Sequence, residues 1–141
     1  MRVVAFGPAL TVTEQDAGGV SATGFPMTNC FVSELPTTVT ISMVIAVCAL
    51  SGGEYDPVQY LIATAPDGER AAAMEFRWHW QDIDETPVKY RVFAQYLPLR
   101  IKSTGIYTIG LYDRLDSVET VAEFPMPVHS YDPMTQGPGN F

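Results

Sequence analysis

Residues 105–113 constrain the fold most, because Gly105 is followed by a run of alternating side chains that ends at Asp113. A period of two residues is typical of a β-strand with one buried face. Similar short runs recur along the whole chain, separated by Gly, Pro, Asn and Asp at intervals of roughly 8 to 12 residues. This spacing is typical of antiparallel sandwiches. The sequence therefore predicts an all-β, single-domain antiparallel β-sandwich.

Composition limits the classes of partner. The 141 residues fit one domain with a core of its own. Charged residues make up only 17% of the chain, so uncharged and aromatic side chains must complete the surface, which favours contacts with protein. The formal net charge of −8 repels both nucleic acid and anionic membranes. We therefore expect a protein partner or a homo-oligomer, with neither nucleic acid nor membrane as a partner.

The cysteines and the N-terminus bear on the compartment. Cys30 and Cys48 are too few for a disulfide scaffold and lack a metal-binding spacing. Buried free thiols are the favoured interpretation, with a disulfide between neighbouring strands as the alternative in an oxidising compartment. Residues 1–10 contain one basic residue and an apolar run interrupted by Gly7 and Pro8, which does not resemble an export signal. The longest apolar stretch, residues 41–50, is shorter than the ~20 residues of a membrane helix. We expect a cytoplasmic protein or a virion component.

Turn signals divide the chain into expected strands. Gly18 and Gly19 predict a hairpin turn, and Pro125 and Pro127 predict that the last strand lies at a sheet edge, because proline cannot donate to the ladder. We expect a β-sandwich domain over residues 1–130 and an extended tail over residues 131–141. The expected strands are residues 3–13, 20–25, 29–32, 37–50, 58–65, 70–80, 88–96, 99–101, 105–113 and 118–128.

Two expected strands carry further information. In residues 37–50, one face is apolar from Val39 to Val47, whereas the other is polar before Val44 and apolar from Val44 to Cys48, so we expect this second face to be covered halfway along. Residues 71–75 have helical propensity, but the alternation that follows favours a strand over residues 70–80. Its phase places Met74, Phe76, Trp78 and Trp80 in the core and Glu75, Arg77 and His79 on the surface.

Four pieces of sequence, taken in order, resemble an uncharacterised family of small bacterial and phage β-sandwich domains of unknown function. They are residues 16–25, Leu35 with Pro36, the turn at residues 65–69, and residues 97–99 leading to residues 105–107. The resemblance spans roughly residues 3–128 and implies an immunoglobulin-like fold. It implies no functional residues. Residues 78–80 and the tail from Tyr131 depart from the family pattern, so a specialised role is expected there.

No motif supports an enzyme, a cofactor or a metal. The chain has no nucleophile elbow, zinc-binding helix motif, phosphate-binding loop or dinucleotide fingerprint. Only His79 and His129 are histidines, and neither stands beside a nucleophile motif. Residues 82–85 contain three acids that offer oxygen ligands to Ca²⁺, but their spacing is not that of an EF-hand, so a solvated acidic turn is favoured. A glycosidase requires two facing acids in a cleft, for which a small sandwich has little material.

The aromatic residues favour an interaction surface, because those on alternating strands point to both faces and cannot all fill one core. We expect a non-enzymatic structural or protein-interaction subunit of a larger assembly, with a phage particle component as one form. The alternative is a small-molecule or carbohydrate-binding module that uses the region of Trp78 and Trp80. The tail is expected to pack on an adjacent subunit. The candidate interaction residues are Arg77, His79, Phe93, Tyr131 and Phe141.

Overall fold

The computed structural model describes residues 1–134, and within them the chain is all-β, with ten strands and no helix. Most consecutive strands are separated by Gly, Pro, Asn or Asp, as the turn signals in the sequence predict. They are β1 (Arg2–Ala9), β2 (Thr11–Glu14), β3 (Val20–Thr23), β4 (Cys30–Val32), β5 (Thr37–Leu50), β6 (Val58–Thr64), β7 (Arg70–Arg77), β8 (Val88–Ile101), β9 (Gly105–Tyr112) and β10 (Ala122–Ser130).

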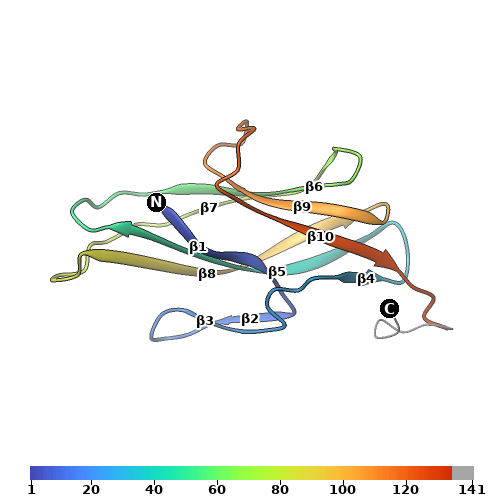
Figure 1. Cartoon of the computed structure of the whole chain (residues 1–141), viewed down its shortest axis with the longest axis horizontal. Coiled ribbons are helices and arrows are strands. Elements are labelled where there is room, and N and C mark those ends of the chain that lie inside the picture. The colour runs from blue at the N-terminus through green and yellow to red at the C-terminus, as the bar shows by residue number, and fades with distance from the viewer. Residues whose placement is uncertain (135–141) are drawn as a thin grey trace.

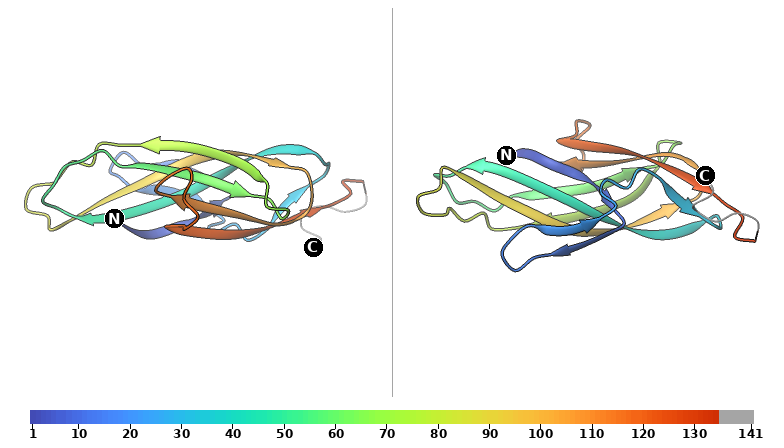
Figure 2. Two further views of the ribbon diagram at one scale, coloured as in Figure 1. Left: turned by 90° about the horizontal axis from the view of Figure 1, so that it is seen from above. Right: turned by 60° about the horizontal axis from the view of Figure 1, so that its bottom comes forward.

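Two sheets enclose the core. One has three strands in the order β1-β5-β8, and the other has five strands in the order β4-β10-β9-β6-β7. Figure 1 shows β6, β9 and β10 of the five-stranded sheet above β5 and β8, with β4 at the lower right, and Figure 2 shows that both sheets run along the long axis of the molecule. The hairpin β2–β3 forms a separate two-stranded sheet on the side of β8 that faces away from β6 and β9 (Figure 1).

Apolar side chains from both sheets meet between the two layers. One face of β5 contributes Ile41, Met43, Ile45 and Val47, as the alternation predicts. The core includes an aromatic cluster, in which the ring centroid of Phe93 lies 4.7 Å from that of Trp78 and 5.1 Å from that of Phe76. Other fully buried side chains are Leu61, Leu97, Leu99, Ile101, Tyr107, Ile109, Leu111 and Met126.

The all-β prediction is confirmed, and β5 has the expected bounds. The residues expected to form two strands, 88–96 and 99–101, instead form the single strand β8, which continues through Pro98. β8 is an edge strand of its sheet, and a proline is tolerated at an edge when its missing N–H is on the unpaired side. The finer expectation of an immunoglobulin-like topology stays a prediction.

The expectation for the last strand is wrong in part. β10 lies inside its sheet, between β9 and β4, and its pairing with β4 is parallel. However, β4 pairs only with the end of β10, from Val128 to Ser130. Pro125 and Pro127 precede that stretch and are paired on the β9 side alone. The prolines therefore occupy the part of β10 that needs no second set of donors.

The two cysteines are unbridged and belong to different sheets: Cys30 on β4 is buried, and Cys48 on β5 is half-buried. Burial raises the pKa of the Cys30 thiol. Helices long and apolar enough to cross a membrane are absent from residues 1–134.

Candidate interaction surface

The outer face of the three-stranded sheet is the surface that departs most from the expected pattern of an exposed sheet. Core-facing residues of β5 and β8 alternate with residues that point away from the core, such as Val44 and Cys48 on β5 and Tyr90 and Val92 on β8. An antiparallel sheet with a solvated face normally carries polar side chains there. These side chains are mostly apolar, so the face requires a cover.

The hairpin β2–β3 covers the middle of this face, around Val44. Val12 of β2 packs against Ala9 and Val44, with Ala94 at the margin of the same cluster. The hydroxyl of Tyr96 donates a hydrogen bond of 2.9 Å to the carbonyl of Val12. The prediction that the second face of β5 is covered from its midpoint is therefore correct for Val44.

Toward the end of β5 and the start of β8 this face has no such cover among residues 1–134, and we name that part the open face. Its most exposed members are Leu50, with 79% of its surface accessible, Tyr90, with 62%, and Ile83 of the β7–β8 loop, with 59%. The register places Cys48 beside Tyr90 and Leu50 beside Val88, so the apolar residues form adjoining rows. The open face consists of Cys48, Leu50, Ile83, Val88, Tyr90 and Val92.

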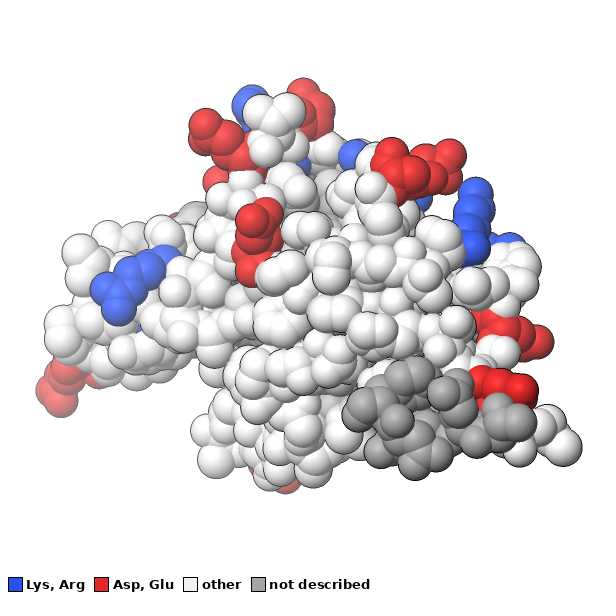
Figure 3. Space-filling view, turned by 45° about the vertical axis from the view of Figure 1, so that its right-hand side comes forward, with Lys and Arg blue, Asp and Glu red and all other residues white. Residues whose placement is uncertain are grey.

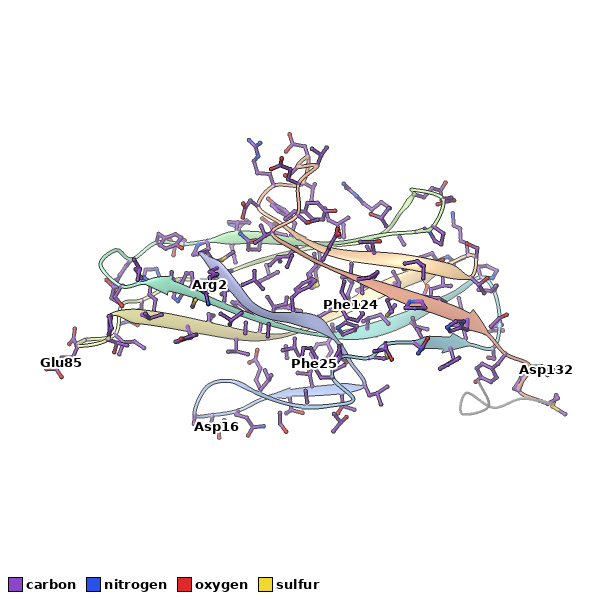
Figure 4. All side chains as sticks on the ribbon, viewed as in Figure 1. Arg2, Asp16, Phe25, Glu85, Phe124 and Asp132 are labelled. Carbon is purple, nitrogen blue, oxygen red and sulfur yellow. The ribbon has the colours of Figure 1, made fainter. Side chains whose placement is uncertain are left out.

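Two hollows lie on the open face and adjoin at Val88 and Tyr90. The larger, of about 630 Å³, is bounded by the hairpin turn at residues 14–19 and by Ile83. The smaller, of about 410 Å³, runs from Tyr90 across Cys48 to the start of β1. Figure 4 shows Asp16 at the tip of the hairpin and Glu85 at the tip of the β7–β8 loop, so both segments project beyond the sheet.

A buried lysine holds the loop that carries Ile83. Lys89 points into the molecule, and its side chain is only 1% exposed. Its Nζ donates hydrogen bonds to Asp82 Oδ1 at 2.8 Å, the Gly53 carbonyl at 2.8 Å and the Trp80 carbonyl at 3.2 Å. A buried ammonium needs such partners, since burial without them strongly disfavours its charged form. The hydrogen bond from Lys89 lowers the pKa of Asp82 below its usual range.

The β5–β6 loop is tied to the same place. The backbone N–H of Gly52 donates to Asp82 Oδ2 at 3.1 Å, and the N–H of Asp82 donates to Glu54 Oε2 at 3.1 Å. His79 lies next to this network, with Nδ1 2.7 Å from Asp56 Oδ1 and Nε2 3.4 Å from Glu54 Oε1. The hydrogen bond with Asp56 raises the pKa of His79. These contacts hold the β5–β6 loop and the β7–β8 loop together at the end of the open face.

The predicted phase of residues 74–80 is correct. Phe76, Trp78 and Trp80 are buried and Met74 is half-buried, whereas Glu75, Arg77 and His79 are exposed. The two tryptophans are thus part of the core and offer no exposed platform to a carbohydrate.

The predicted interaction residues do not form one surface. Arg77 pairs with Glu75 on the exposed side of β7, and His79 takes part in the loop network. Phe93 is only 6% exposed, in contrast to its predicted place on an interaction surface, because it points inward from β8 into the aromatic cluster. The N–H of Tyr131 donates to the Val32 carbonyl at 3.0 Å, which attaches it to its own chain. Phe141 lies outside the described residues.

The residues that sequence reasoning missed are Lys89 and the open face beside it. Alternation showed two faces on β8 but did not identify the inner one, since both contain apolar residues. The sequence signal that could have revealed the open face is the apolar character of both faces of β8, because a second apolar face requires a second cover. Within residues 1–134, no group of His, Cys, Asp and Glu is arranged to hold a metal ion.

Comparisons of the chain with protein-family models, with curated proteins and with solved structures find no match.

Proposed function

We propose that this chain is a non-enzymatic structural or protein-interaction subunit of a larger assembly, and that a partner covers the open face. A phage particle is one assembly of this kind. The proposal also includes an immunoglobulin-like arrangement of the two sheets, in line with the resemblance of residues 3–128. The expected compartment is the cytoplasm or the virion.

One observation carries the proposal. Leu50 and Tyr90 are exposed on a sheet face that is buried under the hairpin β2–β3 around Val44, and Ile83 is exposed in the adjoining β7–β8 loop. Isolated exposed apolar residues are ordinary, but a contiguous group is typical of a contact with protein. The overall surface fits this use, because charged side chains are only 17% of the chain, and in Figure 3 they gather mainly along the upper and right-hand edges around a broad uncharged area. Low charge reduces the cost of removing water at an interface.

The test is a pair of substitutions on the open face. Leu50→Glu and Tyr90→Glu each place a charge where a partner is expected, and burying an unpaired charge is unfavourable. Val118→Glu is the matched control, because Val118 is 95% exposed in the β9–β10 loop. The mass of the native particle that contains each variant is measured by light scattering and sedimentation.

We expect both open-face variants to leave the assembly while remaining folded, and the control to stay in it. A wild-type chain that is monomeric in its native extract contradicts the proposal. If that monomer binds in a glycan array, the carbohydrate-binding alternative replaces it.

A further inference from the structure

The edge of β8 is protected along one part of its length and unprotected along another. β8 pairs with β5 on one side only, and the pairing has no register shift between residues 88 and 101. The N–H of Ser51 donates to the Pro87 carbonyl, and the N–H of Ala94 donates to Glu14 Oε1 on the hairpin. The backbone carbonyl of Pro87 thus points toward β5, whereas the backbone N–H of Ala94 points away from it. Because backbone groups alternate along an antiparallel strand, the N–H groups of Val88, Tyr90 and Val92 also point away from β5.

Three features protect the second half of this edge. Glu14 accepts from the Ala94 N–H, the hydroxyl of Tyr96 holds the hairpin alongside through Val12, and Pro98 has no N–H to offer. Proteins protect edge strands by such means, because free N–H and C=O groups pair with other chains. No equivalent feature among residues 1–134 protects Tyr90 and Val92.

The unprotected stretch coincides with the larger hollow. This hollow is lined by Val88, Tyr90 and Val92 and bounded by the hairpin turn and Ile83. A strand beside β8 occupies a row about 4.8 Å away, and the hollow of about 630 Å³ lies beside Val88, Tyr90 and Val92. Two separate observations, the direction of the backbone groups and the place of the hollow, therefore mark the same stretch.

We propose that the partner enters as an extended segment that pairs with β8 along residues 88–92 and becomes a fourth strand of the sheet β1-β5-β8. This inference rests on the proposed function and names the chemistry of the partner. Strand addition of this kind takes its affinity from backbone hydrogen bonds and its specificity from alternate side chains. The side chains that face Tyr90 and Ile83 are apolar.

The charge of the partner follows from the hairpin turn. Glu14 and Asp16 line the hollow, and residues 14–19 contain no Lys or Arg. Arg91 also lines the hollow, but its Cζ lies 5.5 Å from the centre of the Phe93 ring, on the face of β8 opposite to Tyr90. A basic residue on the segment is thus attracted to Asp16, and the net charge of −8 steers such a segment toward the protein.

The experiment uses a defined probe, the peptide Lys-Thr-Val-Thr-Val-Thr-Lys, with the full-length protein. Amide hydrogen exchange and NMR spectra are recorded while the peptide is added. We expect saturable shifts centred on Tyr90 and Val92 and about tenfold slower exchange of their N–H groups. A peptide with its central amides N-methylated cannot supply the backbone donors and should not bind. Equal binding of the methylated peptide, or no change along residues 88–92, overturns strand addition.

Separate variants test the expected positive charge of the partner segment. Replacing both lysines of the peptide by glutamates should weaken binding about tenfold. Asp16→Lys should make the protein bind the glutamate peptide more tightly than the lysine peptide. Asp116→Lys is the control, because it changes the net charge by the same amount but lies in the β9–β10 loop, and it should still prefer the lysine peptide. An unchanged preference in Asp16→Lys overturns the basic partner.

Two outcomes separate this inference from the proposed function. If Leu50→Glu and Tyr90→Glu leave the assembly but no peptide slows exchange at Tyr90, the interaction surface stands and strand addition is wrong. If exchange at Tyr90 and Val92 slows as the protein alone is concentrated into dimers, the segment belongs to a second copy, and the basic partner is wrong.

Discussion

Lys89 Nζ lies 2.8 Å from Asp82 Oδ1, and this contact joins the inner face of β8 to the loop that bounds the open face. The lysine is buried, whereas the side chain of Asp82 is about one-third exposed, at 29%. The two carbonyls that also accept from Nζ, those of Gly53 and Trp80, belong to different loops. One side chain thus positions both loops at this end of the molecule.

Lys89→Ala should lower the free energy of unfolding by about 3 kcal/mol, because two carbonyls and a carboxylate lose a buried charged donor. Lys102→Ala is the control, since Lys102 is 65% exposed and its Nζ lies 3.5 Å from Glu69; it should change stability by less than about 0.5 kcal/mol. Urea denaturation measures both. Equal stability of the two variants contradicts a structural role for Lys89.

His79 should make stability depend on pH in one direction. Its pKa is raised by the hydrogen bond with Asp56, with a further contribution from Glu54, so the folded protein binds the proton more tightly than the unfolded chain. The stabilisation is complete below the ordinary histidine pKa of about 6.5 and is lost as pH rises through the raised pKa.

The measurement is urea denaturation of wild type and His79→Gln across this range. The difference in their unfolding free energies should be largest at acidic pH and fall toward alkaline pH. A difference that grows with pH has the wrong sign for this contact. Because Asp56 and Glu54 are solvent-accessible, added salt should reduce the difference.

Local patterns predicted most of the strands but not all their neighbours. The alternation of residues 74–80 and the turn at Gly18 and Gly19 depend on adjacent residues, so both predictions hold. The place of β10 depends on its parallel pairing with β4, about a hundred residues earlier in the chain. Pro125 and Pro127 report only that one side of the strand lacks donors, which does not exclude a neighbour beyond them.

The open face was only partly predictable for a related reason. The apolar second half of β5 indicated that a cover is needed, and the hairpin β2–β3 supplies it at Val44. Nothing in the alternation shows that the cover stops before Cys48 and Leu50. Lys89 was harder still, because a lysine in an alternating strand is normally a surface residue, and its three acceptors come from loops distant in sequence.

Trp78→Ala should lower the free energy of unfolding by about 3 to 5 kcal/mol, as expected for a buried aromatic. The ring centroid of Trp78 lies 4.7 Å from that of Phe93 and 5.6 Å from that of Trp80. Removal of the Trp78 ring therefore leaves a cavity inside the aromatic cluster. Tyr90→Ala on the open face should change stability by less than about 1 kcal/mol. Thermal and urea unfolding distinguish the two, and a loss under about 1 kcal/mol for Trp78→Ala contradicts its place in the core.

Gly105, the first residue of β9, should tolerate substitution poorly. Its φ is +132°, which side chains rarely adopt, and an added Cβ would lie 2.7 Å from Cγ of Pro66. Gly105→Ala should therefore cost about 2 kcal/mol, from backbone strain and from displacement of the Pro66 turn. Gly53→Ala is the matched control, because no atom lies within 4 Å of its added Cβ. Urea denaturation should show a near-neutral control and a destabilised Gly105→Ala. If the two variants unfold at the same urea concentration, the close approach of Gly105 to Pro66 does not constrain the turn into β9.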